Sequence, residues 1–169
     1  LEAIEHSTRP ITITHANPHS WSPALRNKSD DVLRALGQSG GMLGFSLYPH
    51  HLLGESAFTF ESFCEMIART ADLLGSAQIG IGSDLCQDQP DSIVEWMRTG
   101  RWTKTIDYGE GSAAAPGFPP MMDWYADNRH FGNIADGLAK TGLSSAEIEG
   151  IMGQNWHRFF AESFGRASK

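Results

Sequence analysis

Three short apolar runs, each bounded by turn or breaker residues, predict β-strands. They span residues 11–15, 42–48 and 78–84. Between the first two runs, Ser29 has the character of an N-cap for a helix that continues through Leu36 and stops at Gly40 and Gly41. Before the third run, apolar side chains recur at helical spacing, at Phe60, Phe63, Met66, Ile67, Leu73 and Leu74. Strands that alternate with helices predict an α/β fold with a parallel sheet and crossover helices.

The second half of the chain is less regular. A long connecting segment at about residues 85–133 contains a short helical pattern at 92–97, and connections of this length usually serve a function such as a lid or a binding loop. Ser144 and Glu147 then form a capping-box pattern, which predicts the start of the last helix. Its apolar stripe consists of Ile148, Ile151, Met152, Phe159 and Phe160.

The predicted sheet is incomplete on its own. Three parallel strands cannot close a barrel, and as an open sheet they leave two edges without hydrogen-bond partners. Residues 1–6 have the pattern of the tail of a helix. We therefore expect one domain unit over residues 1–169, with a covering partner and a further portion of protein upstream.

Composition narrows the function classes. The 169 residues are 40% hydrophobic and 20% charged, as in a globular domain. A formal net charge of -7, with the basic residues scattered, argues against nucleic acid as a partner. No apolar run approaches the roughly 20 residues of a membrane-spanning helix. Cys64 and Cys86 show no C-x-x-C spacing, which predicts two free thiols in a reducing compartment.

Two predicted strands end in residue types that commonly bind metals. His15 closes the first strand and Asp84 closes the third, and in parallel α/β folds the functional groups gather at the carboxyl ends of strands. A His and an Asp at that edge suit zinc, and the Asp also suits the role of a proton acceptor for metal-bound water. The alternative from the residues alone is a structural His15 that is hydrogen-bonded at a strand end.

Five motifs have a distinctive order and spacing. They are R-P-I-T-I-T-H-A-N at 9–17, R-N-K-S-D-D-V-L at 26–33, G-G-M-L-G-F-S-L-Y at 40–48, I-G-I-G-S-D at 79–84 and G-I-M-G-Q-N-W-H-R-F at 150–159. Together they resemble the renal (membrane) dipeptidase family, which is zinc-dependent and belongs to the amidohydrolase superfamily. The resemblance covers nearly the whole chain.

The resemblance implies a (β/α)8 TIM-type barrel of which this chain is the C-terminal part, about strands 6–8 and their helices. It implies a dipeptidase that cleaves the amide bond of dipeptides through a metal-bridging hydroxide at a binuclear zinc site. Matched residue by residue, His15 and Asp84 are metal ligands, and Asp84 is also the catalytic residue beside the bridging water. Arg26 is the arginine that binds the substrate carboxylate, and Asn27 and Tyr48 are weaker substrate-binding candidates.

The rest of the implied zinc site has no match in this chain. The resemblance therefore implies that the N-terminal half of the same barrel is a partner, and that this chain alone is inactive. The substrate implied is a small dipeptide-like molecule, and a homo-oligomer is compatible with the sequence.

Two alternatives stay open. Ala16-Asn17-Pro18 stands where the family commonly has small residues, typically serine, and Leu85-Cys86-Gln87 replaces its usual Phe-Asp-Gly. These departures allow an amidohydrolase that acts on another small amide. The third reading is a metal-free half-barrel that serves as a binding module.

Overall fold

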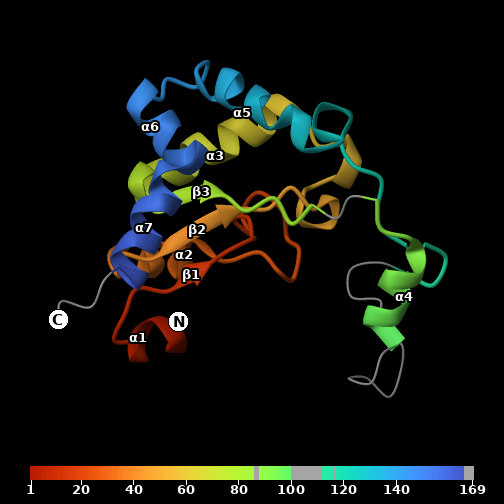
Figure 1. The fold of residues 1–169 in the computed structure, drawn as a ribbon, viewed down its shortest axis with the longest axis horizontal. Helices are drawn as coiled ribbons and strands as arrows, with labels where there is room; N and C mark the ends of the chain where they lie inside the picture. Colours follow the sequence, from red (N-terminus) through yellow and green to blue (C-terminus); the bar gives the residue numbers. More distant parts are fainter. Residues whose placement is uncertain (86–87, 100–111, 116, 166–169) are drawn as a thin grey trace.

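The computed structural model describes residues 1–85, 88–99, 112–115 and 117–165 (Figure 1). The strands are β1 (Thr12–Ile13), β2 (Met42–Phe45) and β3 (Ile79–Ile81). The α-helices are α1 (Glu2–His6), α2 (Asp30–Gln38), α3 (Phe60–Leu74), α4 (Asp91–Thr99), α5 (Phe131–Leu138), α6 (Ser145–Glu149) and α7 (Asn155–Phe164). Short 3-10 turns lie at Pro49–His51, Glu55–Ala57, Ser76–Gln78, Asp123–Tyr125 and Asn128–His130, and a π-helical turn at Gly150–Gln154 joins α6 to α7.

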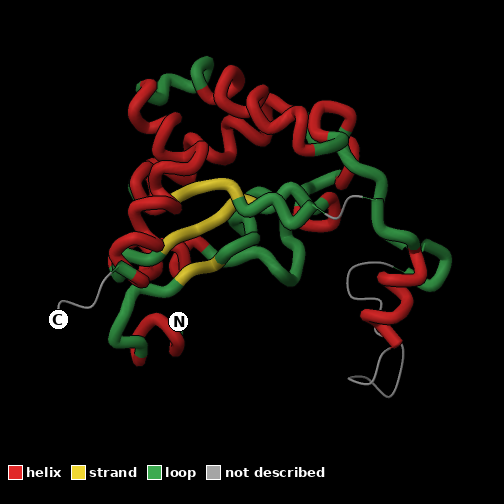
Figure 2. The backbone as a smooth tube through the Cα atoms, in the orientation of Figure 1, coloured by secondary structure: helices red, strands yellow, loops and turns green. Residues whose placement is uncertain are grey.

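The three strands form one parallel sheet in the order β1-β2-β3 (Figure 2). Thr12 pairs with Met42, and Leu43 pairs with both Ile13 and Ile79. The helices α2 and α3 are the crossover connections between successive strands. The predicted α/β fold with a parallel sheet is confirmed, as is the helix at the start of the chain.

The strands are shorter than predicted, so neither His15 nor Asp84 closes a strand. His15 follows the last residue of β1 by two positions and Asp84 follows that of β3 by three. After β1 the chain leaves the regular pleat. The carbonyl oxygen of Thr14 lies so close to β2 that a Cβ on Gly44 would be 2.1 Å from it. Single backbone bonds still continue the pairing, from Ala16 N to Gly44 O at 3.0 Å and from Leu47 N to Ser83 O at 3.0 Å.

One face of the sheet packs against α2 and α3. Leu43, Phe45 and Ile79 are fully buried on this face, and the ring of Phe45 meets that of Phe63 edge-on at 6.3 Å. The helices supply the other side of this core with Leu33, Leu36, Phe63, Met66, Ile67 and Leu74. Because α3 was predicted from the spacing of these same apolar residues, its burial follows from its amphipathic pattern.

The opposite face carries glycines and is covered by α7. A Cβ on Gly44 or Gly80 would lie within 3.0 Å of the Trp156 ring, so the indole packs directly on the sheet backbone. Its Nε1 donates to Ile81 O at 3.1 Å. Nearby, the buried Asn155 side chain donates to Ser76 O and Ile79 O at 2.8 Å each, which fixes α7 at the amino end of β3.

The sequence predicted capping residues at the start of two helices, and only one of them forms its capping hydrogen bonds. The Ser144 and Glu147 capping box is present, with both side chain to backbone bonds formed. The Ser29 side chain, in contrast, makes no capping hydrogen bond to α2 although Ser29 is the N-cap residue. The predicted last helix is also interrupted, because Gly153 takes non-helical backbone angles between α6 and α7.

The segment at 85–133 leaves the sheet and returns to it. Its helix α4 lies away from the sheet in Figure 1, with Trp96 and Met97 more than half exposed, whereas Tyr125 is fully buried. Trp124 packs on the rings of Phe60 and Phe63 at 5.3 Å each. The part of this predicted segment at 100–111 lies outside the described residues.

The predicted free thiol at Cys64 is confirmed, and this cysteine is buried on α3. Cys86 lies outside the described residues. Within the described ranges, no helix combines the length and the hydropathy that crossing a membrane requires.

Candidate active site

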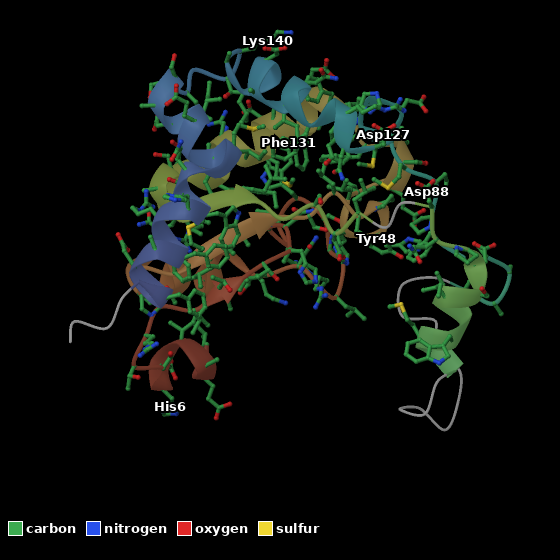
Figure 3. The ribbon with its side chains drawn as sticks, in the orientation of Figure 1. His6, Tyr48, Asp88, Asp127, Phe131 and Lys140 are labelled. Carbon is green, nitrogen blue, oxygen red and sulfur yellow. The ribbon has the colours of Figure 1, made fainter. Side chains whose placement is uncertain are left out.

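The candidate residues lie on loops that follow the carboxyl ends of the strands. His15 and Arg26 belong to the loop after β1, and Tyr48 belongs to the loop after β2. Figure 3 shows Tyr48 beyond the tips of the strands, on the side toward which all three arrows of Figure 1 point. Parallel strands bring such loops to one edge of the sheet, where ligands bind in open α/β folds.

His15 and Arg26 are in contact. A terminal guanidinium nitrogen of Arg26 lies within hydrogen-bond distance of His15 Nε2. The other ring nitrogen of His15, Nδ1, lies 2.8 Å from the Thr14 hydroxyl oxygen. A guanidinium has only donors, so Nε2 is the ring nitrogen that accepts in this contact. A histidine that binds a metal through Nε2 commonly has a hydrogen-bond partner at Nδ1, and the Thr14 hydroxyl is such a partner here.

Tyr48 joins this neighbourhood through two histidines. Its partly buried ring meets His50 and His51 edge-on, with ring centres 5.5 and 5.1 Å apart. His50 in turn lies 3.0 Å from the Glu55 carboxylate through Nδ1. Glu55 adopts a left-handed φ of 55°, an uncommon backbone conformation for a residue other than glycine. Tyr48 therefore packs among the side chains of the loop after β2.

Asn27 has a different position from the one expected of a substrate-binding residue. Its side chain is 6% exposed, and its amide donates to Ser22 O and His51 O at 2.9 Å each. Its oxygen accepts from Asn17 N at 2.8 Å. Both N–H groups are used by the protein backbone, so the visible role of Asn27 is to hold the chain next to Arg26.

Asp84 is exposed in the loop that follows β3 and has a left-handed φ of 55°. Aspartate tolerates this conformation better than most residues because its short polar side chain forms local hydrogen bonds. The bond from Leu47 N to Ser83 O anchors the residue just before it. Asp84 thus lies at the carboxyl end of the sheet, as the sequence led us to expect.

The described residues do not complete a zinc site. Nowhere in the described ranges do three His, Cys, Asp or Glu side chains come together as a group that could hold a metal. A catalytic zinc normally has three protein ligands, and the described part of the chain offers two candidates, His15 and Asp84. In addition, the nitrogen of His15 that is suited to a metal faces the Arg26 guanidinium.

Sequence reasoning missed a buried polar cluster beside these residues. Asn17 is fully buried, Ser46 is fully buried and His51 is 5% exposed. The Ser46 hydroxyl lies 2.8 Å from His51 Nδ1. Burial is the largest cause that lowers the pKa of His51 from 6.5 to about 4, followed by the charges of Arg26, His15, His50 and Lys28. His51 is therefore neutral near pH 7.

Solved structures of similar shape include an amidohydrolase and a metallopeptidase. An amidohydrolase from Pseudomonas aeruginosa matches with a TM-score of 0.81 and 25% identity over 98% of this chain and 49% of its own. A metallopeptidase from Rhodobacter sphaeroides, bound to a phosphinate mimic of the dipeptide L-Ala-D-Ala, matches with a TM-score of 0.69 and 18% identity over 94% of this chain and 37% of its own. These likenesses establish a fold shared with TIM-barrel amidohydrolases.

Sequence comparison gives a more specific result. A dipeptidase of Claviceps purpurea is 22% identical over 163 residues, which cover 96% of this chain and 31% of that protein. An uncharacterised protein of Klebsiella pneumoniae is 30% identical over 87 residues, which cover 49% of this chain and 32% of that protein. The chain therefore spans about a third of the length of these relatives.

Residues 1–98 match the family model of the membrane dipeptidases, peptidase family M19. The matched part contains both loops of the candidate site and all three strands. The predicted family is thereby confirmed. This chain belongs to the membrane dipeptidase family, peptidase family M19.

Proposed function

We propose that this chain is the C-terminal part, about strands 6–8, of a (β/α)8 barrel that hydrolyses dipeptides with the help of zinc. Its family supports this class of reaction. The observation that carries the proposal is the contact between Arg26 and His15, because it joins a carboxylate-binding group to a candidate zinc ligand. A dipeptide presents its free carboxylate a few bonds from its amide, so both groups of the site act on one small substrate.

Zinc, when bound, lowers the pKa of water and polarises a carbonyl group. We propose His15 and Asp84 as two of its ligands, with the others supplied by residues outside the described ranges. The shortage of ligands within those ranges supports this division. The N-terminal half of the same barrel is the partner that fits this role, since it also supplies the strands that the open sheet lacks.

The chain's own residues then bind and orient the substrate. Arg26 is exposed, and its planar guanidinium suits the two oxygens of a terminal carboxylate. Its present neighbour, Nε2 of His15, offers one acceptor atom, whereas a carboxylate offers two oxygens and forms stronger charge-assisted bonds. The ring of Tyr48 borders the same edge. Asp84 accepts the proton of the attacking water at a carboxylate oxygen.

The test of this function is the dependence of hydrolysis on the substrate carboxylate. We expect Arg26→Gln to lower kcat/KM for a dipeptide by about 10–100-fold, the equivalent of one charge-assisted hydrogen bond. The same variant should hydrolyse the dipeptide's C-terminal amide no worse than the unmodified protein. The matched control is Arg69→Gln, which removes an exposed arginine on α3 that pairs with Glu65. An equal loss for the dipeptide and its amide would contradict the assignment.

A second substrate class is supported by one observation. Asn17 stands where the family commonly has serine, and its buried side chain shapes the loop that carries Arg26. A changed loop suits another small amide. Assays of dipeptides against non-peptide amides of similar size, under the same zinc loading, separate the two substrates by their relative kcat/KM.

A further inference from the structure

Two loops of the candidate site are fastened together by buried amides. The loop after β1 contributes Asn17 and Asn27, and the loop after β2 contributes the backbone of Ser46 and His51. We call these four residues the amide brace. The hydrogen bonds between the two loops join residues that are 24 to 34 positions apart along the chain. They therefore fix one loop against the other rather than shaping either loop alone.

Asn17 is the centre of the brace. Its amide donates to Ser46 O at 3.1 Å and to His51 O at 3.2 Å, and its oxygen accepts from Ser46 N at 3.1 Å. Both donors are therefore used, and the side chain is 0% exposed. Its backbone N–H donates to the Asn27 oxygen at 2.8 Å. A buried polar network in which every donor has a partner holds a single arrangement, because any other leaves a polar group unsatisfied.

The brace lies next to each candidate residue of the two loops. Asn17 follows His15 by two residues, and Asn27 directly follows Arg26. Tyr48 lies between Ser46 and His51. His51 O accepts from both asparagines, so a single carbonyl ties together the chain segments that carry Arg26 and His15. Precise placement of binding groups requires such rigid supports, since a shift of about 1 Å is costly for activity.

We propose that Asn17 and Asn27 are positioning residues that fix the chain segments carrying Arg26 and His15 relative to one another, and so set the distance between the carboxylate-binding group and the metal-binding edge. The inference rests on the proposed function for its consequence, and on the hydrogen bonds of the brace for its structural basis. The proposed role of both asparagines is exerted through the positions of Arg26 and His15 rather than through a contact with the substrate. The expected substrate is a dipeptide whose carboxylate lies a fixed distance from its amide.

The chain provides a matched control at the other end of the sheet. Asn155 is 4% exposed, and its amide also donates twice to backbone, to Ser76 O and Ile79 O. Its oxygen accepts from Arg158 at 3.0 Å. Asn155 has the same chemistry and burial as Asn17 but lies at the amino end of β3. Its replacement should cost stability without disturbing the candidate site.

The first experiment follows the His15 ring directly in the complete protein without zinc, by nitrogen NMR, whose ring signals report hydrogen bonds at Nδ1 and Nε2. An Arg26→Ala variant gives the reference signal of the ring without its guanidinium neighbour. We expect Asn17→Ala and Asn27→Ala to move the Nε2 signal toward this reference, and Asn155→Ala to leave it in place. If Asn17→Ala gives a poorly folded chain, Asn17→Ser is used, because it keeps a small polar group. An unchanged Nε2 signal in folded variants of both asparagines would overturn the proposal.

The second experiment is kinetic and separates this inference from the proposed function. In the zinc-loaded enzyme we expect Asn17→Ala and Asn27→Ala to raise KM for a dipeptide by about 10-fold or more, in the range found for residues that orient a metal ligand. Asn155→Ala should leave KM unchanged at a temperature where all variants are folded. Unchanged KM and kcat in the Asn17 and Asn27 variants would refute a role in positioning. If the unmodified enzyme hydrolyses no dipeptide, the proposed function fails, while the NMR result still decides whether the brace holds Arg26 against His15.

Discussion

At the scale of single residues, the candidate site includes buried side chains whose amides donate to the protein backbone. Sequence patterns identified His15, Arg26, Tyr48 and Asp84 through their motifs. They did not identify Asn17 and His51 as a pair. The hydrogen bond between the Asn17 amide and the His51 carbonyl joins residues 34 positions apart, so it leaves no local sequence pattern. The resemblance gave Asn27 as a weaker substrate-binding candidate, and in the structure its buried amide donates to the backbone. Long-range polar contacts of this kind follow from the packing of loops, which periodicity does not encode.

His51 should make stability depend on pH. The folded state lowers the pKa of its ring from 6.5 to about 4, mainly through burial. Between these values the unfolded chain binds the proton and the folded chain does not, so stability falls as the pH is lowered from 6.5 to 4. At about 1.4 kcal/mol per pKa unit, the full loss is about 3 kcal/mol. Urea unfolding at pH 7, 6, 5 and 4 measures this loss.

The control for this prediction is His51→Gln, which keeps a polar side chain of similar length and removes the titrating ring. Its free energy of unfolding should be lower at pH 7 and should change less between pH 6.5 and 5. A slope equal to that of the unmodified chain in this window would show that another group is responsible. Asp127, whose pKa is lowered to about 2 by Arg129, titrates below the window.

Asp84 offers a direct test of the catalytic assignment. Its left-handed backbone, with a φ of 55°, makes Asn the best-matched replacement, because Asn tolerates this conformation as Asp does. We expect Asp84→Asn in the zinc-loaded enzyme to lower kcat for a dipeptide by at least about 100-fold, the usual effect of losing a general base. Metal content, measured by atomic emission, should fall much less. Near-normal turnover would remove Asp84 from the mechanism.

At the scale of elements, the sequence predicted which segments fold but not where they end. The helices α2 and α3 and all three strands were located from apolar spacing, because burial of one face decides both patterns. The strand ends were placed too late, since the Thr14 carbonyl crosses over glycines of the neighbouring strands. The break at Gly153 was missed because the apolar stripe continues across it, from Ile151 to Phe159, on either side of the kink.

The glycines of the sheet have a measurable role at this scale. A Cβ on Gly44 would lie 2.1 Å from the Thr14 oxygen, so Gly44→Ala forces the backbone of the loop before His15 to move. We expect a loss of about 1–3 kcal/mol in the free energy of unfolding, as for other overpacked sites. The control is Gly132→Ala on α5, where a Cβ meets nothing within 4 Å. That variant should be neutral or more stable by up to about 1 kcal/mol, because alanine favours a helix more than glycine does.

Chemical denaturation of the two glycine variants, compared with the unmodified chain, distinguishes a steric effect from a general one. If Gly44→Ala and Gly132→Ala change stability by the same amount and in the same direction, the close approach of Thr14 to the sheet does not restrict position 44. Gly44→Ala should also slow or abolish dipeptide hydrolysis, since Thr14 and His15 move with that backbone.

At the scale of the whole molecule, the sheet has more edge than a stable domain leaves open. In the order β1-β2-β3, each outer strand has a neighbour on one side only among the described residues. Exposed edges of this kind pair readily with other strands. The solved relatives of the same fold are about twice as long or more, with this chain covering 49% and 37% of the two compared above. A partner that supplies further strands would satisfy both edges and provide the zinc ligands that are missing from the described residues.

The open sheet edges and the incomplete zinc site predict which polypeptide portions and metal ions the active protein contains. Denaturing intact mass spectrometry of the active protein should detect a second portion of comparable size to this 18.5 kDa segment. The second portion is either a separate polypeptide or part of the same one. Metal analysis of the native material should give about two zinc ions per complete barrel, as expected for a binuclear site. A chelator should then abolish hydrolysis, and added zinc should restore it. If an 18.5 kDa species hydrolyses dipeptides alone and without metal, the zinc ligands are not divided between two halves of a barrel. The same result would contradict the roles given to His15 and Asp84.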